Sequence, residues 1–212
     1  MEAQFWVQKW ENDEIPFHEK ETNSLLVKYF EVLALVKGDR IFVPLCGKTL
    51  DIAWLISNGY RVAGAELSEI AIKQLFADLG VEPKISKIGE LKHYSAENLD
   101  IFVGDIFTVS RTMLGQVDGV YDRAALVALP VGMRKQYTTH ITKLTDNAPQ
   151  LLICFEYDQS MMDGPPFSIS NNEINQHYSN RYNLSLLEEL DVPGGLKGKC
   201  AAREKIWFLQ RH

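Results

Sequence analysis

IFVPLCGKTLDIAWLISNGYRVAGAELS, residues 41–68, predicts a strand, a glycine turn, a helix, a second strand and an acidic end. The first strand, IFVP, is short and apolar, as expected for burial on both faces of a parallel sheet. Gly47 closely follows Pro44, and a glycine at this turn lets a ligand approach the backbone. Asn58-Gly59 ends the predicted helix. The order of elements therefore predicts a βαβ unit with a nucleoside site.

The second strand of this unit ends in Glu66, 19 residues after Gly47. A carboxylate at about this spacing accepts hydrogen bonds from ribose hydroxyls in βαβ nucleoside sites. A dinucleotide needs several glycines around its pyrophosphate, whereas this turn has one, with Leu45, Cys46 and Lys48 at neighbouring positions. We therefore expect S-adenosylmethionine, which has no phosphate, and regard a nicotinamide oxidoreductase as a weaker alternative.

The composition limits the class of partner. The chain has 212 residues and a net charge of −6, which suits one domain and offers no basic surface for nucleic acid or an anionic membrane. No apolar run is long enough to span a membrane, and the first residues are acidic rather than a basic leader. We expect a cytoplasmic monomer that acts on a small molecule. Its three cysteines lack metal-ligand spacing, so we expect reduced thiols and no metal site.

Acidic residues also follow two later strands. The strand predicted at 99–103 is followed by Asp105, and the strand at 118–121 runs into Asp122 and Arg123. Open α/β sheets bind ligands at the carboxyl ends of their strands, so Asp105 is a candidate acceptor for an adenine amino group. By the same argument, Asp122 and Arg123 should face the crevice of the glycine turn. A turn aspartate and a surface ion pair are the alternatives.

Two other segments are candidates for covering the site. Residues 1–23 hold four large aromatic side chains among charged residues, and Trp6 and Trp10 share one face if this segment is helical. That face lies either over a ligand or over the sheet edge as a plain capping helix. The loop 159–169, QSMMDGPPFSI, follows a strand end and is suited to be the wall for a flat apolar substrate, or it covers the edge of the core.

The remaining pattern completes an alternating βα series. A helix is predicted at 24–36, a small hairpin within 81–98, and a closing hairpin from the β runs at 184–190 and 205–210. Such a series predicts a mostly parallel sheet with an antiparallel edge.

Five segments, by their order and spacing, resemble the thiopurine S-methyltransferase family over nearly the whole chain. They are VPLCGK, VAGAELSEIAI, GDIF, YDRAALVAL and GPPF. The N-terminal WVQKWENDEIPFH is similar to the segment that closes over the cofactor in that family. The resemblance implies the class I methyltransferase fold: a Rossmann-like α/β three-layer sandwich with a mostly parallel seven-stranded sheet, one antiparallel edge strand and an N-terminal helical cap. It also implies one domain over 1–212, with a cap at 1–36 and a catalytic core at 37–212.

The resemblance implies roles for individual residues as well. It assigns contacts with S-adenosylmethionine to Trp10, Leu45, Glu66, Ile106 and Arg123, to which the pattern itself adds Gly47 and Asp105. It assigns a substrate contact to Phe17, and the GPPF loop adds Pro166 and Phe167. No general base is implied, and Arg123 and Asp122 are the candidates for attracting or orienting a reactant. The stretch GGLKGKC around Lys197 departs from the family pattern.

The implied reaction is an in-line transfer of a methyl group from S-adenosylmethionine to the sulfur of an aromatic or heterocyclic thiol. Such thiols ionise readily, so positioning the reactants is the main catalytic task. The alternatives on the same fold are methyl transfer to halides, to aliphatic thiols, or to selenium or tellurium compounds. An alternative of another class is a protein that binds S-adenosylmethionine without catalysis and grips a partner.

Overall fold

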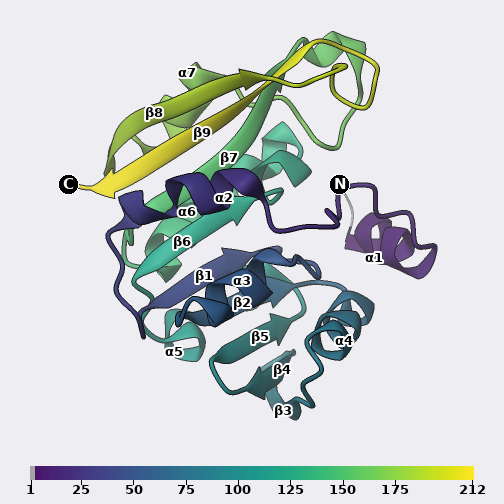
Figure 1. Cartoon of the computed structure of the whole chain (residues 1–212), viewed down its shortest axis with the longest axis vertical. Helices are drawn as coiled ribbons and strands as arrows, with labels where there is room; N and C mark the ends of the chain where they lie inside the picture. The colour runs from purple at the N-terminus through teal and green to yellow at the C-terminus, as the bar shows by residue number, and fades with distance from the viewer. Residues whose placement is uncertain (1–2) are drawn as a thin grey trace.

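Five parallel strands form the centre of the sheet (Figure 1), in a computed structural model that describes residues 3–212. They pair in the order β5-β2-β1-β6-β7. Ile41, Phe42 and Val43 of β1 are buried, as expected for a strand covered on both faces. The five strands are β1 (Arg40–Pro44), β2 (Arg61–Glu66), β5 (Leu99–Val103), β6 (Gly119–Arg123) and β7 (Gln150–Tyr157).

Hairpins extend both edges of this parallel centre. β3 (Lys84–Ile88) and β4 (Leu91–Ala96) join beside β5, and β8 (Tyr182–Asp191) and β9 (Ala202–Arg211) join with β9 antiparallel to β7. Over residues 3–212 the sheet therefore has nine strands, in the order β3-β4-β5-β2-β1-β6-β7-β9-β8. The predicted fold class is confirmed, but the count of seven strands with one antiparallel edge strand is wrong. Each predicted hairpin adds both of its strands to the sheet.

Helices cover both faces and complete a three-layer sandwich. One face carries α2 (Ser24–Tyr29), η1 (Phe30–Leu33), α3 (Asp51–Ser57) and α4 (Glu69–Asp78), whose apolar residues share a core with β1 and β6. The other face carries α5 (Arg111–Leu114), α6 (Val131–Leu144) and α7 (Asn171–Tyr178). The helix predicted at 24–36 is split into α2 and η1, after which Ala34 turns the chain with a φ of 52°.

The carboxyl ends of the five parallel strands lie along one edge of the molecule. α1 (Ala3–Glu11) lies at that edge and contacts α4 (Figure 1). The short turns η2 (Ile106–Thr108), η3 (Leu126–Ala128) and η4 (Gln159–Met161) follow β5, β6 and β7 at the same edge. Within the described residues, no helix is long and apolar enough to cross a membrane. The edge formed by α1 and the strand ends is therefore the place to look for the predicted site.

Candidate active site

The glycine turn after β1 lies directly against the N-terminal helix. Leu45 and Gly47 have left-handed backbone conformations, with φ values of 46° and 52°. A Cβ atom added to Gly47 would lie 3.0 Å from Cζ2 of Trp10, so the indole ring covers the glycine closely. Trp10 is only 5% exposed. The structure thus brings together the predicted cofactor turn and the aromatic residue predicted to close over it.

Glu66 joins the ends of the first two strands. Its Oε2 accepts a hydrogen bond from the backbone N–H of Gly47 at 2.8 Å, and its Oε1 accepts one from Ser68 N–H at 2.8 Å. Burial raises the pKa of Glu66, and the backbone N–H groups of Ser68, Gly47 and Leu67 oppose that rise. Each carboxylate oxygen keeps a lone pair for another donor. A carboxylate held in this way beside a glycine turn fits the two hydroxyl groups of a ribose.

The turn after β5 offers the residues predicted for the adenine base. Ile106 is buried at the start of η2, and Nε2 of His140 lies 2.9 Å from its carbonyl oxygen. Asp105 is exposed, and its carboxylate accepts a hydrogen bond from Phe107 N–H at 3.0 Å. Asp105 is therefore the cap of this turn, and its second oxygen remains available to an exocyclic amino group.

Arg123 at the end of β6 is tied to two other segments. Its guanidinium group, 14% exposed, forms an ion pair with Glu19 from the segment between α1 and α2. It also lies 3.8 Å from Oδ2 of Asp51 at the start of α3. Asp51 is itself buried, and accepts hydrogen bonds from Asn23 N–H at 2.8 Å and from the Tyr121 hydroxyl at 3.0 Å. The sequence pattern did not predict the roles of Glu19 and Asp51, because neither belongs to a periodic motif.

Asp122 lies on the opposite side of the same strand. It is fully buried, its Oδ1 accepts from Leu126 N–H at 3.1 Å, and its Oδ2 accepts from the Tyr137 hydroxyl at 2.7 Å. Burial raises the pKa of Asp122 to about 6, against the lowering effect of these hydrogen bonds. The prediction that Asp122 and Arg123 face the same crevice is therefore wrong, because neighbouring residues on a strand point to opposite faces. Asp122 anchors the turn that follows β6.

Phe17 connects the aromatic residues of the N-terminal segment. Its ring lies edge-on to the rings of Trp6 and Trp10, with a centroid distance of 5.6 Å in each pair. Such edge-to-face pairs favour a fixed arrangement of rings. Trp6, Trp10 and Phe17 therefore form an aromatic cluster above the glycine turn, on the same segment that carries Glu19.

The GPPF loop is held from three directions. Phe167 N–H donates to the Val127 carbonyl at 2.7 Å, and the Tyr157 hydroxyl donates to the Pro166 carbonyl at 2.7 Å. Nζ of Lys197 donates to the Pro165 carbonyl at 2.6 Å. The peptide bonds before Pro165 and Pro166 are both cis. The loop is thus fixed to the chain at residues far apart in the sequence.

Lys197 lies in the stretch that departs from the family pattern. Burial lowers the pKa of Lys197, and the ammonium groups of Lys199 and Lys9 lower it further. Lys9 belongs to α1, so a charge of the N-terminal helix acts on the segment between β8 and β9. Sequence reasoning did not predict this interaction, since the segment has no regular pattern.

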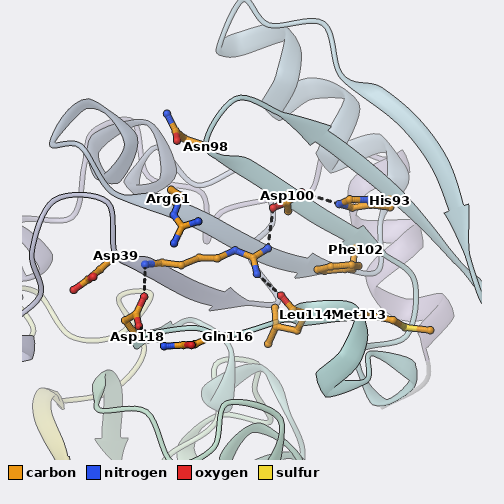
Figure 2. Close-up of a pocket in the computed structure, with 11 residues that line it drawn as sticks. Asp39, Arg61, His93, Asn98, Asp100, Phe102, Met113, Leu114, Gln116 and Asp118 are labelled. Atoms are coloured by element: carbon orange, nitrogen blue, oxygen red, sulfur yellow. Dashed lines mark hydrogen bonds and ion pairs between the residues drawn. The ribbon is translucent and has the colours of Figure 1, made fainter.

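An open cleft of about 640 Å³ lies away from this site, at the amino ends of β1, β2 and β6 (Figure 2). Its polar groups bind one another: the Arg40 guanidinium pairs with Asp100 at 2.8 Å and donates to the Leu114 carbonyl, and His93 Nε2 lies 2.9 Å from Asp100 Oδ1. Asp118 accepts from Arg40 N–H at 2.8 Å. This network fastens the strands together. In the described part of the chain, no cluster of three or more His, Cys, Asp or Glu residues could hold a metal ion.

The fold and the carboxylate beside the glycine turn define a class I S-adenosylmethionine-dependent methyltransferase. The structure is similar to a 1,6-didemethyltoxoflavin-N1-methyltransferase of Burkholderia thailandensis that holds S-adenosylhomocysteine, with a TM-score of 0.66, 13% identity, and coverage of 98% of this chain and 87% of that one. It is also similar to an S-adenosylmethionine-dependent methyltransferase from Anabaena variabilis, with a TM-score of 0.65, 14% identity, and coverage of 99% and 95%. At these identities the likeness shows the fold.

The sequence comparisons give the family. The model of the thiopurine S-methyltransferase family matches residues 1–212. The thiopurine S-methyltransferase of Xanthobacter autotrophicus is 53% identical over the full length of both chains, and that of Teredinibacter turnerae is 49% identical over 100% of this chain and 99% of its own. This chain belongs to the thiopurine S-methyltransferase family, and is an enzyme that uses S-adenosylmethionine for S-methylation.

Proposed function

We propose that the enzyme methylates the sulfur of aromatic or heterocyclic thiols. The observation that carries this proposal is the cluster of Trp6, Trp10 and Phe17, which lies on the segment whose Glu19 meets Arg123. Aromatic rings favour a flat apolar acceptor, and a guanidinium group favours an anionic one. An aromatic thiolate combines both properties.

The cofactor supplies, when bound, a methyl group on a sulfonium centre that a sulfur nucleophile can take directly. We assign its ribose to Glu66, its adenine to Ile106 and Asp105, and contacts along the turn to Leu45 and Gly47. Trp10 covers the turn, and Arg123 attracts either the carboxylate of the cofactor or the anionic acceptor. These assignments rest on the contacts described above and on the similarity to the family.

The residues of the chain contribute mainly by positioning. Phe17, Pro166 and Phe167 form the walls for the acceptor ring, and the cluster of aromatic rings excludes water from the reacting atoms. Cys46 is buried, and burial raises the pKa of its thiol well above the ordinary value. Cys46 is therefore no nucleophile at neutral pH, which agrees with a direct transfer to the acceptor.

The test is a panel of acceptors with release of S-adenosylhomocysteine as the readout. We expect the highest kcat/KM for an aromatic or heterocyclic thiol, and lower values for an aliphatic thiol, hydrosulfide, iodide and selenium or tellurium compounds. Phe17→Ala should raise KM for the aromatic thiol, whereas Phe5→Ala is the matched control, because Phe5 contacts Trp6 rather than Phe17. A preference for iodide or hydrosulfide would contradict the proposed acceptor. Cofactor binding without turnover of any acceptor would favour a binding protein.

Three further assignments stay predictions. These are the division into a cap at 1–36 and a core at 37–212, a monomeric state, and a cytoplasmic location. Size-exclusion chromatography with light scattering tests the monomeric state. A fragment that begins at residue 37 tests the division into cap and core. It would lack α2 and η1, whose Leu26 and Phe30 are buried against the sheet. We expect that fragment to be unstable, so the cap is better tested by point substitutions in α1.

A further inference from the structure

Glu204 is a partly buried carboxylate that has no hydrogen bond or ion pair to any residue of the described range 3–212. It lies near the start of β9, opposite Phe155 of β7 and Leu190 of β8. The neighbouring Glu156 and Glu189, by contrast, both form ion pairs with Lys205. A partly desolvated carboxylate without a hydrogen bond or a close ion pair is unfavourable for folding, so its presence points to a role towards a ligand.

The alternation of side chains places Glu204 on the side of the sheet that carries the candidate site. Ile206, two residues further along β9, belongs to the core beneath α2 and α3, so Glu204 points to the same face. Tyr121 of β6 belongs to that same core, so Arg123 also points there. Lys205 points to the other face, where it donates to Asn171 at the start of α7.

Strand register gives the separation of Glu204 from Arg123. Arg123 is opposite Ile153 of β7, and Ile153 is opposite Ile206 of β9. Two strand spacings across the sheet and two residues along β9 place the Cα atoms of Arg123 and Glu204 about 12 Å apart. Both side chains are long and lie on the same face of the sheet, so one small ligand at this place can contact the guanidinium and the carboxylate.

The charges around Glu204 come from several elements. Burial raises the pKa of Glu204; Arg123 opposes the rise and Glu19 adds to it. Asp51 of α3 lies beside Arg123 on the same face. On β8, the carboxylate of Glu188 is already held by Lys28 and by the hydroxyl of Tyr29 in α2. Of these four carboxylates, Glu204 is the one that forms no hydrogen bond or ion pair within residues 3–212.

We propose that Glu204 accepts the proton of the acceptor thiol, which extends the reaction to thiols that are not ionised at neutral pH. This inference rests on the proposed function. The S–H bond of the acceptor breaks, and its proton passes to a carboxylate oxygen of Glu204. The electron pair stays on sulfur and forms the new bond to the methyl carbon, while the old carbon–sulfur bond breaks and its pair leaves with S-adenosylhomocysteine. The carboxylic acid then returns its proton to solvent, which the partly exposed side chain can reach.

The first experiment compares Glu204→Gln with the wild-type enzyme on two acceptors. One is a nitro-substituted aromatic thiol that is ionised at neutral pH, and the other is a weakly acidic benzylic thiol. Loss of a general base should lower kcat/KM for the benzylic thiol by about 10²- to 10⁴-fold. It should leave the ionised thiol and the affinity for S-adenosylhomocysteine nearly unchanged. Asp191→Asn is the matched control, because it removes one negative charge from an exposed position of the same hairpin.

The second experiment does not depend on turnover. Carbon-13 NMR of side-chain carboxyl groups should show one resonance that is absent in Glu204→Gln and that titrates above the ordinary glutamate value. An unreactive aromatic alcohol, added with S-adenosylhomocysteine, should move this resonance. A resonance that ignores the alcohol, or an equal loss of activity on both thiols, would overturn the role of Glu204. If the wild-type enzyme methylates no thiol at all, the proposed function fails instead.

Discussion

Replacing Asp122 by asparagine should change how stability depends on pH. Asp122 is fully buried, and burial raises its pKa from 3.8 to about 6. Between these two pH values the native state binds a proton that the unfolded state has lost, so native stability falls as the pH rises. The difference of about 2 pH units, at 1.36 kcal/mol per unit, corresponds to about 3 kcal/mol. Asparagine does not ionise and escapes this loss.

The assay is urea unfolding of the wild-type enzyme and of Asp122→Asn at pH 4 and pH 7. The free energy of unfolding of the wild-type enzyme, relative to that of the variant, should fall by about 2 kcal/mol over this range, because part of the effect lies below pH 4. Asparagine still accepts from Leu126 N–H, whereas the Tyr137 hydroxyl must reorient, which adds an offset that does not depend on pH. Glu66 titrates in both proteins and cancels. An equal difference at both pH values would refute the reasoning.

The same variant separates an anchoring role of Asp122 from a catalytic one. Both oxygens of this carboxylate are bound within the fold, and no part of the residue is exposed. We therefore expect Asp122→Asn to bind S-adenosylhomocysteine with the wild-type affinity when measured by calorimetry at pH 7. A large loss of affinity in a stably folded variant would restore Asp122 as a candidate for orienting the cofactor.

Two further substitutions test the candidate site. Glu66→Ala leaves the buried N–H groups of Gly47 and Ser68 without their acceptor and removes the proposed ribose ligand. The free energy of binding S-adenosylhomocysteine, measured by calorimetry, should therefore weaken by roughly 1 to 3 kcal/mol. Unchanged affinity would mean that Glu66 is not the ribose ligand. Glu19→Gln removes the ion pair between Glu19 and Arg123 and leaves only the longer contact of Arg123 with Asp51, so KM for an anionic aromatic thiol should fall. Stability should change by less than about 1 kcal/mol because Glu19 is 44% exposed, and a higher KM would show that Glu19 aids the acceptor.

The geometry of the proposed cofactor half of the site was predictable because it is local. The spacing of 19 residues between Gly47 and Glu66 predicted their proximity, and the structure joins them with a hydrogen bond of 2.8 Å. Parallel pairing of β1 with β2 brings their carboxyl ends together, whatever else the chain does. Trp10 was predicted as a cover from the family similarity, and it packs on the same turn.

The rest of the site depended on information that a single sequence does not carry. Asp122 was placed on the wrong face because the polar character of a strand end does not show which of two neighbours points inward. Glu204 lies on the antiparallel strand β9, between β7 and β8, and its register with β7 follows from long-range pairing rather than from a local motif. Lys197 and Glu19 belong to irregular segments, where no periodicity predicts a direction for the side chain.

The two halves of the site are therefore built in different ways. The proposed cofactor half comes mainly from one continuous βαβ unit. The proposed acceptor half combines the N-terminal segment of Phe17, the GPPF loop and the β8–β9 hairpin of Glu204. Two of these segments, the GPPF loop and the hairpin, meet over a long sequence distance through the bond from Lys197 to the Pro165 carbonyl. A substitution in the hairpin can thus change which acceptor fits without moving Gly47 or Glu66. For this reason, binding of S-adenosylhomocysteine and choice of acceptor should respond to different substitutions.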